Sequence, residues 1–130
     1  MPNNTPKTHE LTFDYMRILV HTFLNRPPED GSDQWHTWRR LKKNGTSHKT
    51  DASCFVKPDH ISLNIYDKDA SVFKTEMANA GWTVTVNDPR STLMTRYNVR
   101  MPTMIATNTQ LTILKKWVQK TVGAFQVRMT

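Results

Sequence analysis

Apolar positions recur with a helical period near the start of the chain. In residues 8–25 they cover well over half of a helical wheel and leave a single narrow polar strip. Thr8 is a suitable N-cap, and the Pro27-Pro28 pair stops a helix. We therefore predict a helix over residues 8–25 that is either central in the core or half of a homodimer contact.

A second helix is predicted over residues 33–43, DQWHTWRRLKK, between a Ser32 cap and the Asn44-Gly45 stop. An acid near its start and bases near its end suit the helix dipole. At about 100° per residue, Trp35 and Trp38 share one arc with Leu41, so both tryptophans are assigned to the core. The adjoining arc carries a row of cationic donors: His36, Arg39, Arg40 and Lys43.

Apolar and polar residues alternate in two later segments, and each pattern predicts an antiparallel hairpin. The first joins residues 54–57 to residues 60–66 across Pro58-Asp59, a good pair for a tight turn. The second joins residues 82–86 to a strand at about residues 93–101. The polar side of the two hairpins carries Ser62, Asn64, Tyr66, Thr83, Thr85, Arg96, Asn98 and Arg100.

Two further helices are predicted, one over residues 70–80 with an Asp69 cap and a Gly81 stop, and one from Asn108 or Thr109 to Val122. The last helix has one apolar stripe around Trp117, which belongs in the core. Its opposite face carries lysines with no acid three or four residues away. The tail at residues 125–129 alternates and would suit a short C-terminal edge strand.

The resulting order, ααββαββα, predicts an α+β fold with an antiparallel sheet of about four strands and helices packed mainly on one face. A chain of 130 residues is close to the commonest size of one domain. We therefore expect a single domain over residues 1–130, with residues 1–7 as a loose N-terminal extension.

Composition agrees with a folded protein, since 37% of the residues are hydrophobic and 22% are charged. There is no basic leader and no apolar run near the roughly 20 residues that span a bilayer, so we expect a cytoplasmic protein without membrane contact. The one cysteine, Cys54, is expected to be a reduced, buried thiol.

The net charge of +7 is concentrated in two segments, residues 35–60 and 91–130. The second of these contains six Lys and Arg and no Asp or Glu. Such surfaces attract phosphate backbones, although a basic surface also serves solubility alone. The sequence thus predicts a non-enzymatic nucleic-acid-binding accessory protein whose binding residues are His36, Arg39, Arg40, Lys43, Lys49, Arg96, Asn98, Arg100, Lys115, Lys116 and Lys120.

The aromatic content of the polar sheet side bears on the kind of nucleic acid. Proteins that bind single strands on a sheet stack bases on aromatic rings. Tyr66 is the aromatic residue assigned to that side, and no RNP-type motif is present. Backbone-directed binding to duplex DNA or structured RNA is therefore the preferred expectation.

Two other function classes remain open. An inhibitor or adaptor of the mobile-element accessory type would bind a larger enzyme or nucleoprotein complex. The apolar arc of residues 8–25 and the methionines Met94, Met101 and Met104 suit such contacts. A metal-free ribonuclease would use His48, Arg39 and Tyr66 as base, charge stabiliser and acid, but nothing in their spacing requires this.

No cofactor or metal is expected from the motifs. His48, Cys54 and His60 match no common zinc spacing. With four glycines in the chain there is also little material for a loop that cradles phosphates.

Overall fold

The computed structural model describes residues 8–28, 30–31, 35–41, 47–89, 93–100 and 105–122. These residues form an α+β fold, as the sequence predicts. Its helices are α1 (Phe13–Leu24), α2 (Asp67–Asn79) and α3 (Asn108–Val122). Its strands are β1 (Thr8–Glu10), β2 (Asp30–Gly31), β3 (His36–Leu41), β4 (Ser47–Lys57), β5 (His60–Tyr66), β6 (Thr83–Pro89), β7 (Met94–Arg100) and β8 (Ile105–Thr107).

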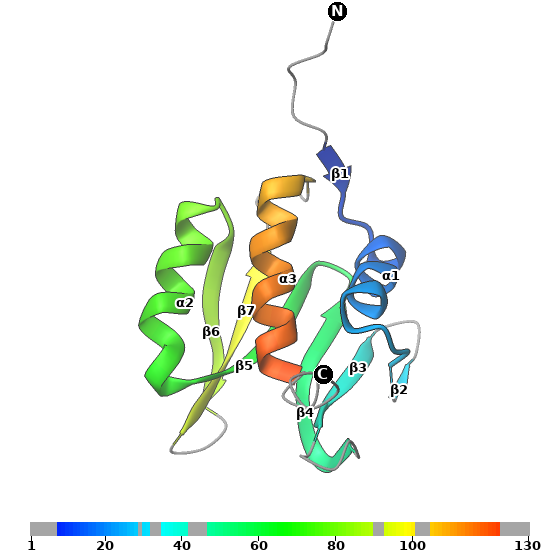
Figure 1. Ribbon diagram of the computed structural model, residues 1–130, viewed down its shortest axis with the longest axis vertical. Coiled ribbons are helices and arrows are strands. Elements are labelled where there is room, and N and C mark those ends of the chain that lie inside the picture. Colours follow the sequence, from blue (N-terminus) through cyan, green and yellow to red (C-terminus); the bar gives the residue numbers. More distant parts are fainter. Residues whose placement is uncertain are drawn as a thin grey trace, which may run out of the picture.

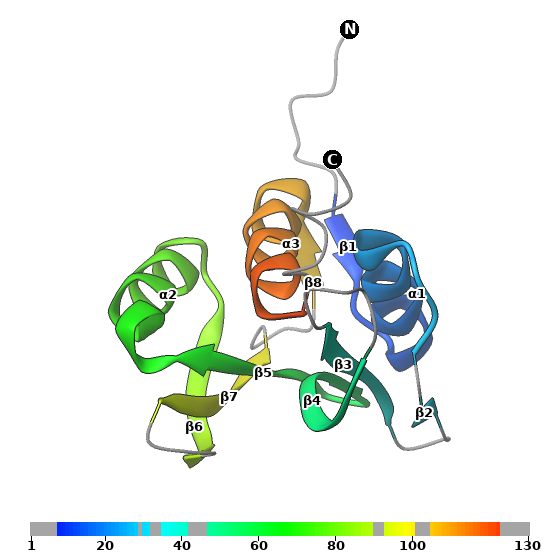
Figure 2. The same ribbon diagram turned by 60° about the horizontal axis from the view of Figure 1, so that its bottom comes forward.

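The main sheet is antiparallel and has the order β2-β3-β4-β5-β7-β6, in which β2 has only two residues. β1 and β8 form a separate antiparallel pair. The three helices lie over one face of the main sheet, with α3 between α1 and α2 (Figures 1 and 2). No described helix lies on the opposite face, which we call the uncovered face.

The core lies between the helices and the sheet. Ile61, Leu63 and Ile65 alternate along β5 and are buried on the helix side. Trp117 of α3 is also buried, and its ring meets Phe73 of α2 edge-on at 5.1 Å between centroids. The period-2 and helical stripes of these segments therefore pack where the sequence predicts.

The predicted helix over residues 33–43 is wrong, because this segment contains strand β3. Trp38 is fully buried in β3, and its indole N–H donates to the carbonyl of Arg26 at 3.0 Å. Both a helical arc and strand alternation turn Trp38 toward the core, so the pattern of this short segment does not separate the two structures. Trp35 precedes the strand and is 44% exposed, so its assignment to the core is also wrong.

The number of strands and the order of elements also differ from the prediction, because further segments form strands. β3 and the short β2 extend the sheet beyond the two predicted hairpins. The first helix begins at Phe13 because the preceding residues pair with β8 as strand β1. Its N-cap is Thr12, not Thr8, and the Thr12 hydroxyl accepts from the Tyr15 amide at 3.1 Å.

Both predicted hairpins are confirmed. Lys57 lies opposite His60 across the first turn, and Val84 lies opposite Val99 in the second hairpin. α2 starts at Asp67, two residues before the predicted Asp69 cap, and its last residue is Asn79. Gly81, the predicted stop, directly follows the C-cap Ala80. The predicted strand at residues 125–129 lies outside the described residues.

Cys54 is free and buried in β4, and burial raises the pKa of its thiol. Within the described part of the chain, none of the helices combines the length and apolar character needed to cross a bilayer.

Candidate functional site

The uncovered face is built from the residues that alternate with the core positions of β4, β5, β7 and β6. One row across these strands runs from Phe55 through Ser62 and Asn98 to Thr85, each opposite the next. The neighbouring row begins with Lys57 and His60, and Arg100 lies opposite Thr83 at its far end. Polar and cationic side chains from distant parts of the sequence thus share one surface.

Arg96 crosses this surface. Its guanidinium lies 4.6 Å from the centre of the Phe55 ring, and its Nε donates to Oδ1 of Asn64 at 3.1 Å. The side chain therefore reaches from β7 over β5 to β4, and Asn64 is buried beneath it. Arginine stacked on an aromatic ring is held in place and still presents its outer plane and edge to a ligand.

A polar hollow of about 160 Å³ opens on this face at the β4–β5 turn, lined by Asp59, His60, Thr85, Asn98 and Arg100. Asp59 ties two of these side chains together, since its carboxylate accepts from Nδ1 of His60 at 2.6 Å and lies 3.8 Å from Nη1 of Arg100. The hydrogen bond from His60 and, to a lesser degree, the charge of Arg100 lower the pKa of Asp59. Asp59 is therefore an ionised acceptor at neutral pH.

Two polar atoms of this face are buried without a hydrogen-bond partner in the described part of the chain: Oγ of Ser62 and Oδ1 of Asn98. Ser62 is only 1% exposed, and it lies opposite Asn98 in the sheet. An unsatisfied buried polar group costs about 1–3 kcal/mol, so folded proteins carry few of them and those few often mark a functional site.

Three of the predicted binding residues belong to the uncovered face. Arg96, Asn98 and Arg100 alternate with the core residues Tyr97 and Val99. The register of β3 with β4 shifts between Trp38 and Arg39, so alternation does not assign Arg39 to either face.

His36 lies elsewhere, on the helix side of β3. Its ring is 5.3 Å from that of Phe13 in α1, and burial, followed by the charge of Arg17, lowers its pKa. The helical row that joined His36 to Arg39 therefore does not exist, because the segment is a strand and has no helical face.

The three lysines of α3 belong to the helix layer, on the other side of the molecule from the uncovered face. Nζ of Lys116 lies 2.8 and 2.9 Å from the two carboxylate oxygens of Glu76, and Lys120 lies 3.8 Å from Asp69. The acids missing from α3 itself are thus supplied by α2. Lys115 has no ion pair within the described ranges.

The remaining predicted residues cannot be placed on a face. The backbones of Arg40 and Lys49 belong to β3 and β4, but their side chains lie outside the described set. Lys43 lies wholly outside the described residues. The side chain of His48, considered above for a ribonuclease, is also outside them.

Sequence reasoning missed the aromatic and acidic members of the site. Phe55 and Lys57 alternate with Cys54 and Val56, so strict period-2 reasoning was enough to place both on the outer side of β4. The hollow needs the β4–β5 turn and the β5–β7 register together, which no local pattern supplies. Among the described residues, no three His, Cys, Asp or Glu side chains are grouped so as to hold a metal ion.

Comparison with known proteins gives no match: no family model, no curated protein and no solved structure is similar to this chain.

Proposed function

We propose that this chain is a small basic nucleic-acid-binding protein without enzymatic activity, and that it binds through the uncovered face of its sheet. One observation carries the proposal: cationic side chains gather around an aromatic ring on a sheet face that no described helix covers. The cationic side chains are Lys57, Arg96 and Arg100.

The charge of this face favours an anionic partner. Its cations come from β4 and β7, the two strands that flank β5, and Asp59 is the one described carboxylate that lines the hollow beside them. Phosphate contacts from Arg and Lys supply most of the affinity of proteins that bind nucleic acid without sequence preference.

Phe55 changes the preferred kind of nucleic acid. The sequence assigned only Tyr66 to this face, which favoured a duplex. With Arg96 stacked over the Phe55 ring, the face offers the outer plane of a guanidinium that an aromatic ring holds in place. Bases of single strands stack on such groups, whereas the bases of a duplex are already stacked on each other. The proposed ligand is therefore a single strand or an unpaired loop.

Fluorescence anisotropy tests the proposal with labelled single strands of about 12 nucleotides and the matching duplex. At roughly 50 mM salt, exchanging both Arg96 and Arg100 for Gln should weaken single-strand binding about tenfold, since two exposed charge contacts contribute roughly 1.4 kcal/mol together. The double Lys variant keeps both charges and should retain most of the affinity.

Lys115→Gln is the matched control, because it removes one exposed charge from the opposite layer and breaks no ion pair among the described side chains. Its affinity should equal that of the wild type. Absence of binding to single strands and duplex alike at low salt would refute the proposal.

The inhibitor or adaptor class remains a second hypothesis. Most large apolar side chains of α1 pack on the core, including Met16, Val20 and Leu24, while Ile18 is 53% exposed. Single exposed apolar side chains are common on folded proteins, so Ile18 adds little support. Capture of partners from a nuclease-treated lysate separates the classes, since only a protein partner survives the nuclease.

A further inference from the structure

We propose that two copies of this chain pair through β6, so that their main sheets join into one antiparallel sheet. β6 lies at one border of the main sheet, next to β7 (Figure 1). Among the described residues, no strand pairs with the other edge of β6. The backbone N–H and C=O groups along such an edge can form a new ladder with a further strand.

β6 is the border strand that suits such pairing. The opposite border of the sheet is β2, which has only two residues. β6 has seven residues, and the first five, TVTVN, include no charged residue and no proline, two features that commonly protect an edge. The register with β7 shifts after Val86, and Pro89 ends the strand. These two features limit the pairing stretch to residues 83–87.

The side chains of this stretch fit a second copy of the same strand. Antiparallel pairing about a two-fold axis at Thr85 sets Thr85 opposite itself and Val84 opposite Val86. Both valines lie on the helix side of the sheet, because they pair with the buried residues Val99 and Tyr97 of β7. Apolar side chains therefore meet on the helix side and hydroxyl groups meet on the uncovered face, with no like charges opposed.

Val86 gives the pairing an apolar contribution. Its side chain is 62% exposed, although it lies on the side of the sheet that the helices cover. Pairing places it against Val84 of the second copy and removes part of this apolar surface from water. A ladder of about five residues buries less than the roughly 1,000 Å² expected of a stable interface, so the dimer should be weak and depend on protein concentration.

This dimer would also extend the proposed binding surface. The two uncovered faces become one continuous face, with Arg100 of each copy, which lies opposite Thr83, on either side of the axis. The pairing itself needs no nucleic acid, so its failure would leave the proposed function unaffected.

Disulfide trapping tests the position of the axis. Residues that face each other in an antiparallel pair have Cα atoms about 4.5–5.5 Å apart, within the range of a disulfide. Thr85→Cys should therefore form a linked dimer about tenfold faster than Thr83→Cys, whose two copies would lie roughly 14 Å apart. Labelling of both variants with a small thiol reagent corrects for exposure. Cys54 is buried, so the wild type gives the background.

Sedimentation velocity over a range of protein concentrations tests the contact without a crosslink. The wild type should shift from monomer to dimer as its concentration rises. Val86→Lys places a charge on the edge and should stay monomeric. Ile18→Lys on α1 is the matched control, because Ile18 is also an exposed apolar side chain, at 53%, and this variant should dimerise like the wild type. Unfolding at the wild-type temperature shows that each variant is intact.

Three results would overturn the proposal. The first is equal linking rates for Thr85→Cys and Thr83→Cys, and the second is a wild type that stays monomeric at every concentration. The third is a dimer that Ile18→Lys abolishes and Val86→Lys does not, which would assign the contact to α1.

Discussion

At the scale of single residues, the indole N–H groups explain how the helix layer is fixed. Trp38 and Trp82 donate to the backbone carbonyls of Arg26 and Gln110, each at 3.0 Å. Trp117 donates to the Glu76 carboxylate, also at 3.0 Å. A buried indole N–H needs a partner, and these three partners lie far away in sequence or in loops. Tryptophan patterns therefore predict burial, as for Trp117, but not the acceptor.

Glu76 gives this layer a pH dependence. Hydrogen bonds from Lys116 and then Trp117 lower its pKa from 4.5. A lowered folded-state pKa stabilises the fold above the unfolded value, and this contribution is lost as pH falls through the folded value. Glu76→Gln should therefore lower the melting temperature at neutral pH, and the difference from wild type should vanish in acid below pH 4.5.

Circular dichroism melts across this pH range measure the effect. Glu10→Gln changes an exposed carboxylate of β1 and should show no such gap at any pH. A gap for Glu76→Gln that persists unchanged in acid would mean that its charge does not stabilise the fold.

At the scale of elements, sequence pattern succeeded where a segment was long or had a defined turn. The α3 stripe and both hairpins follow from periods that extend over several residues, and Gly81 marks the end of α2. The prediction for β3 was wrong because a six-residue segment with a buried Trp38 fits both the helical period and the strand period. This segment forms a strand because it pairs with the edge of β4. That tertiary contact cannot be seen in the local sequence pattern.

Gly81 is the clearest local determinant among these elements. The amide of Trp82 donates to the Met77 carbonyl at 2.9 Å and that of Gly81 to Ala78 at 3.0 Å, which is a Schellman motif. Gly81 has φ 96°, where a Cβ is strained. Gly81→Ala should therefore lower the free energy of unfolding by about 1–2 kcal/mol in urea titrations.

Asn25 serves as the counterpart, since it ends α1 with φ 54° and already has a side chain in the left-handed region. Asn25→Gly removes that strain and should be neutral or slightly stabilising. Equal destabilisation by both substitutions would contradict the conformational explanation.

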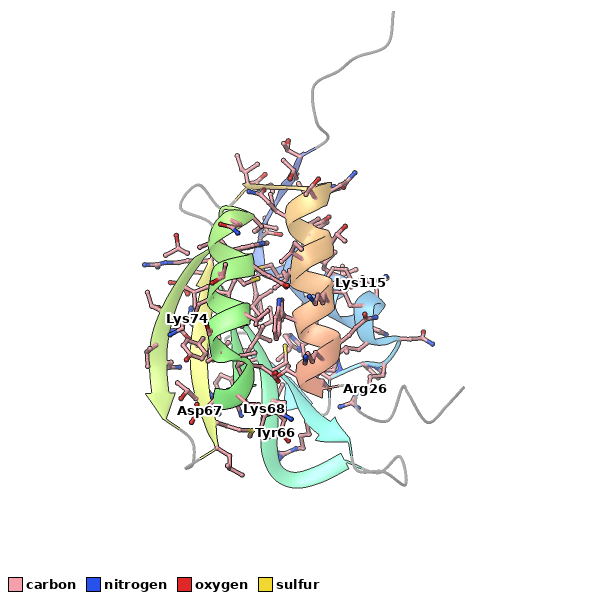
Figure 3. All side chains as sticks on the ribbon, turned by 60° about the vertical axis from the view of Figure 1, so that its left-hand side comes forward. Arg26, Tyr66, Asp67, Lys68, Lys74 and Lys115 are labelled. Carbon is pink, nitrogen blue, oxygen red and sulfur yellow. The ribbon has the colours of Figure 1, made fainter. Side chains whose placement is uncertain are left out.

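At the scale of the whole molecule, the fold divides the basic residues that the sequence grouped by charge alone. Arg96 and Arg100 face outward from the sheet, whereas Lys116 and Lys120 pair with α2 in the helix layer. Counting charges along the chain detects an excess of positive charge but not the face of the molecule on which each charged side chain lies. That face depends on strand register and helix packing. In Figure 3, Lys115 lies on α3 in the helix layer, and Tyr66 lies at the end of β5, where the chain passes from the sheet into α2.

This division predicts how salt dependence responds to each basic residue. A helix with its side chains is about 10 Å thick, more than the Debye length of about 8 Å in physiological salt, so the two layers act separately on a bound strand. Each phosphate contact contributes roughly 0.7 to the slope of log affinity against log salt for single strands. Arg100→Gln should reduce the slope by about that amount, and Lys115→Gln should leave it unchanged. Equal reductions would show that the strand contacts both layers, in which case net charge, and not the sheet face, governs binding.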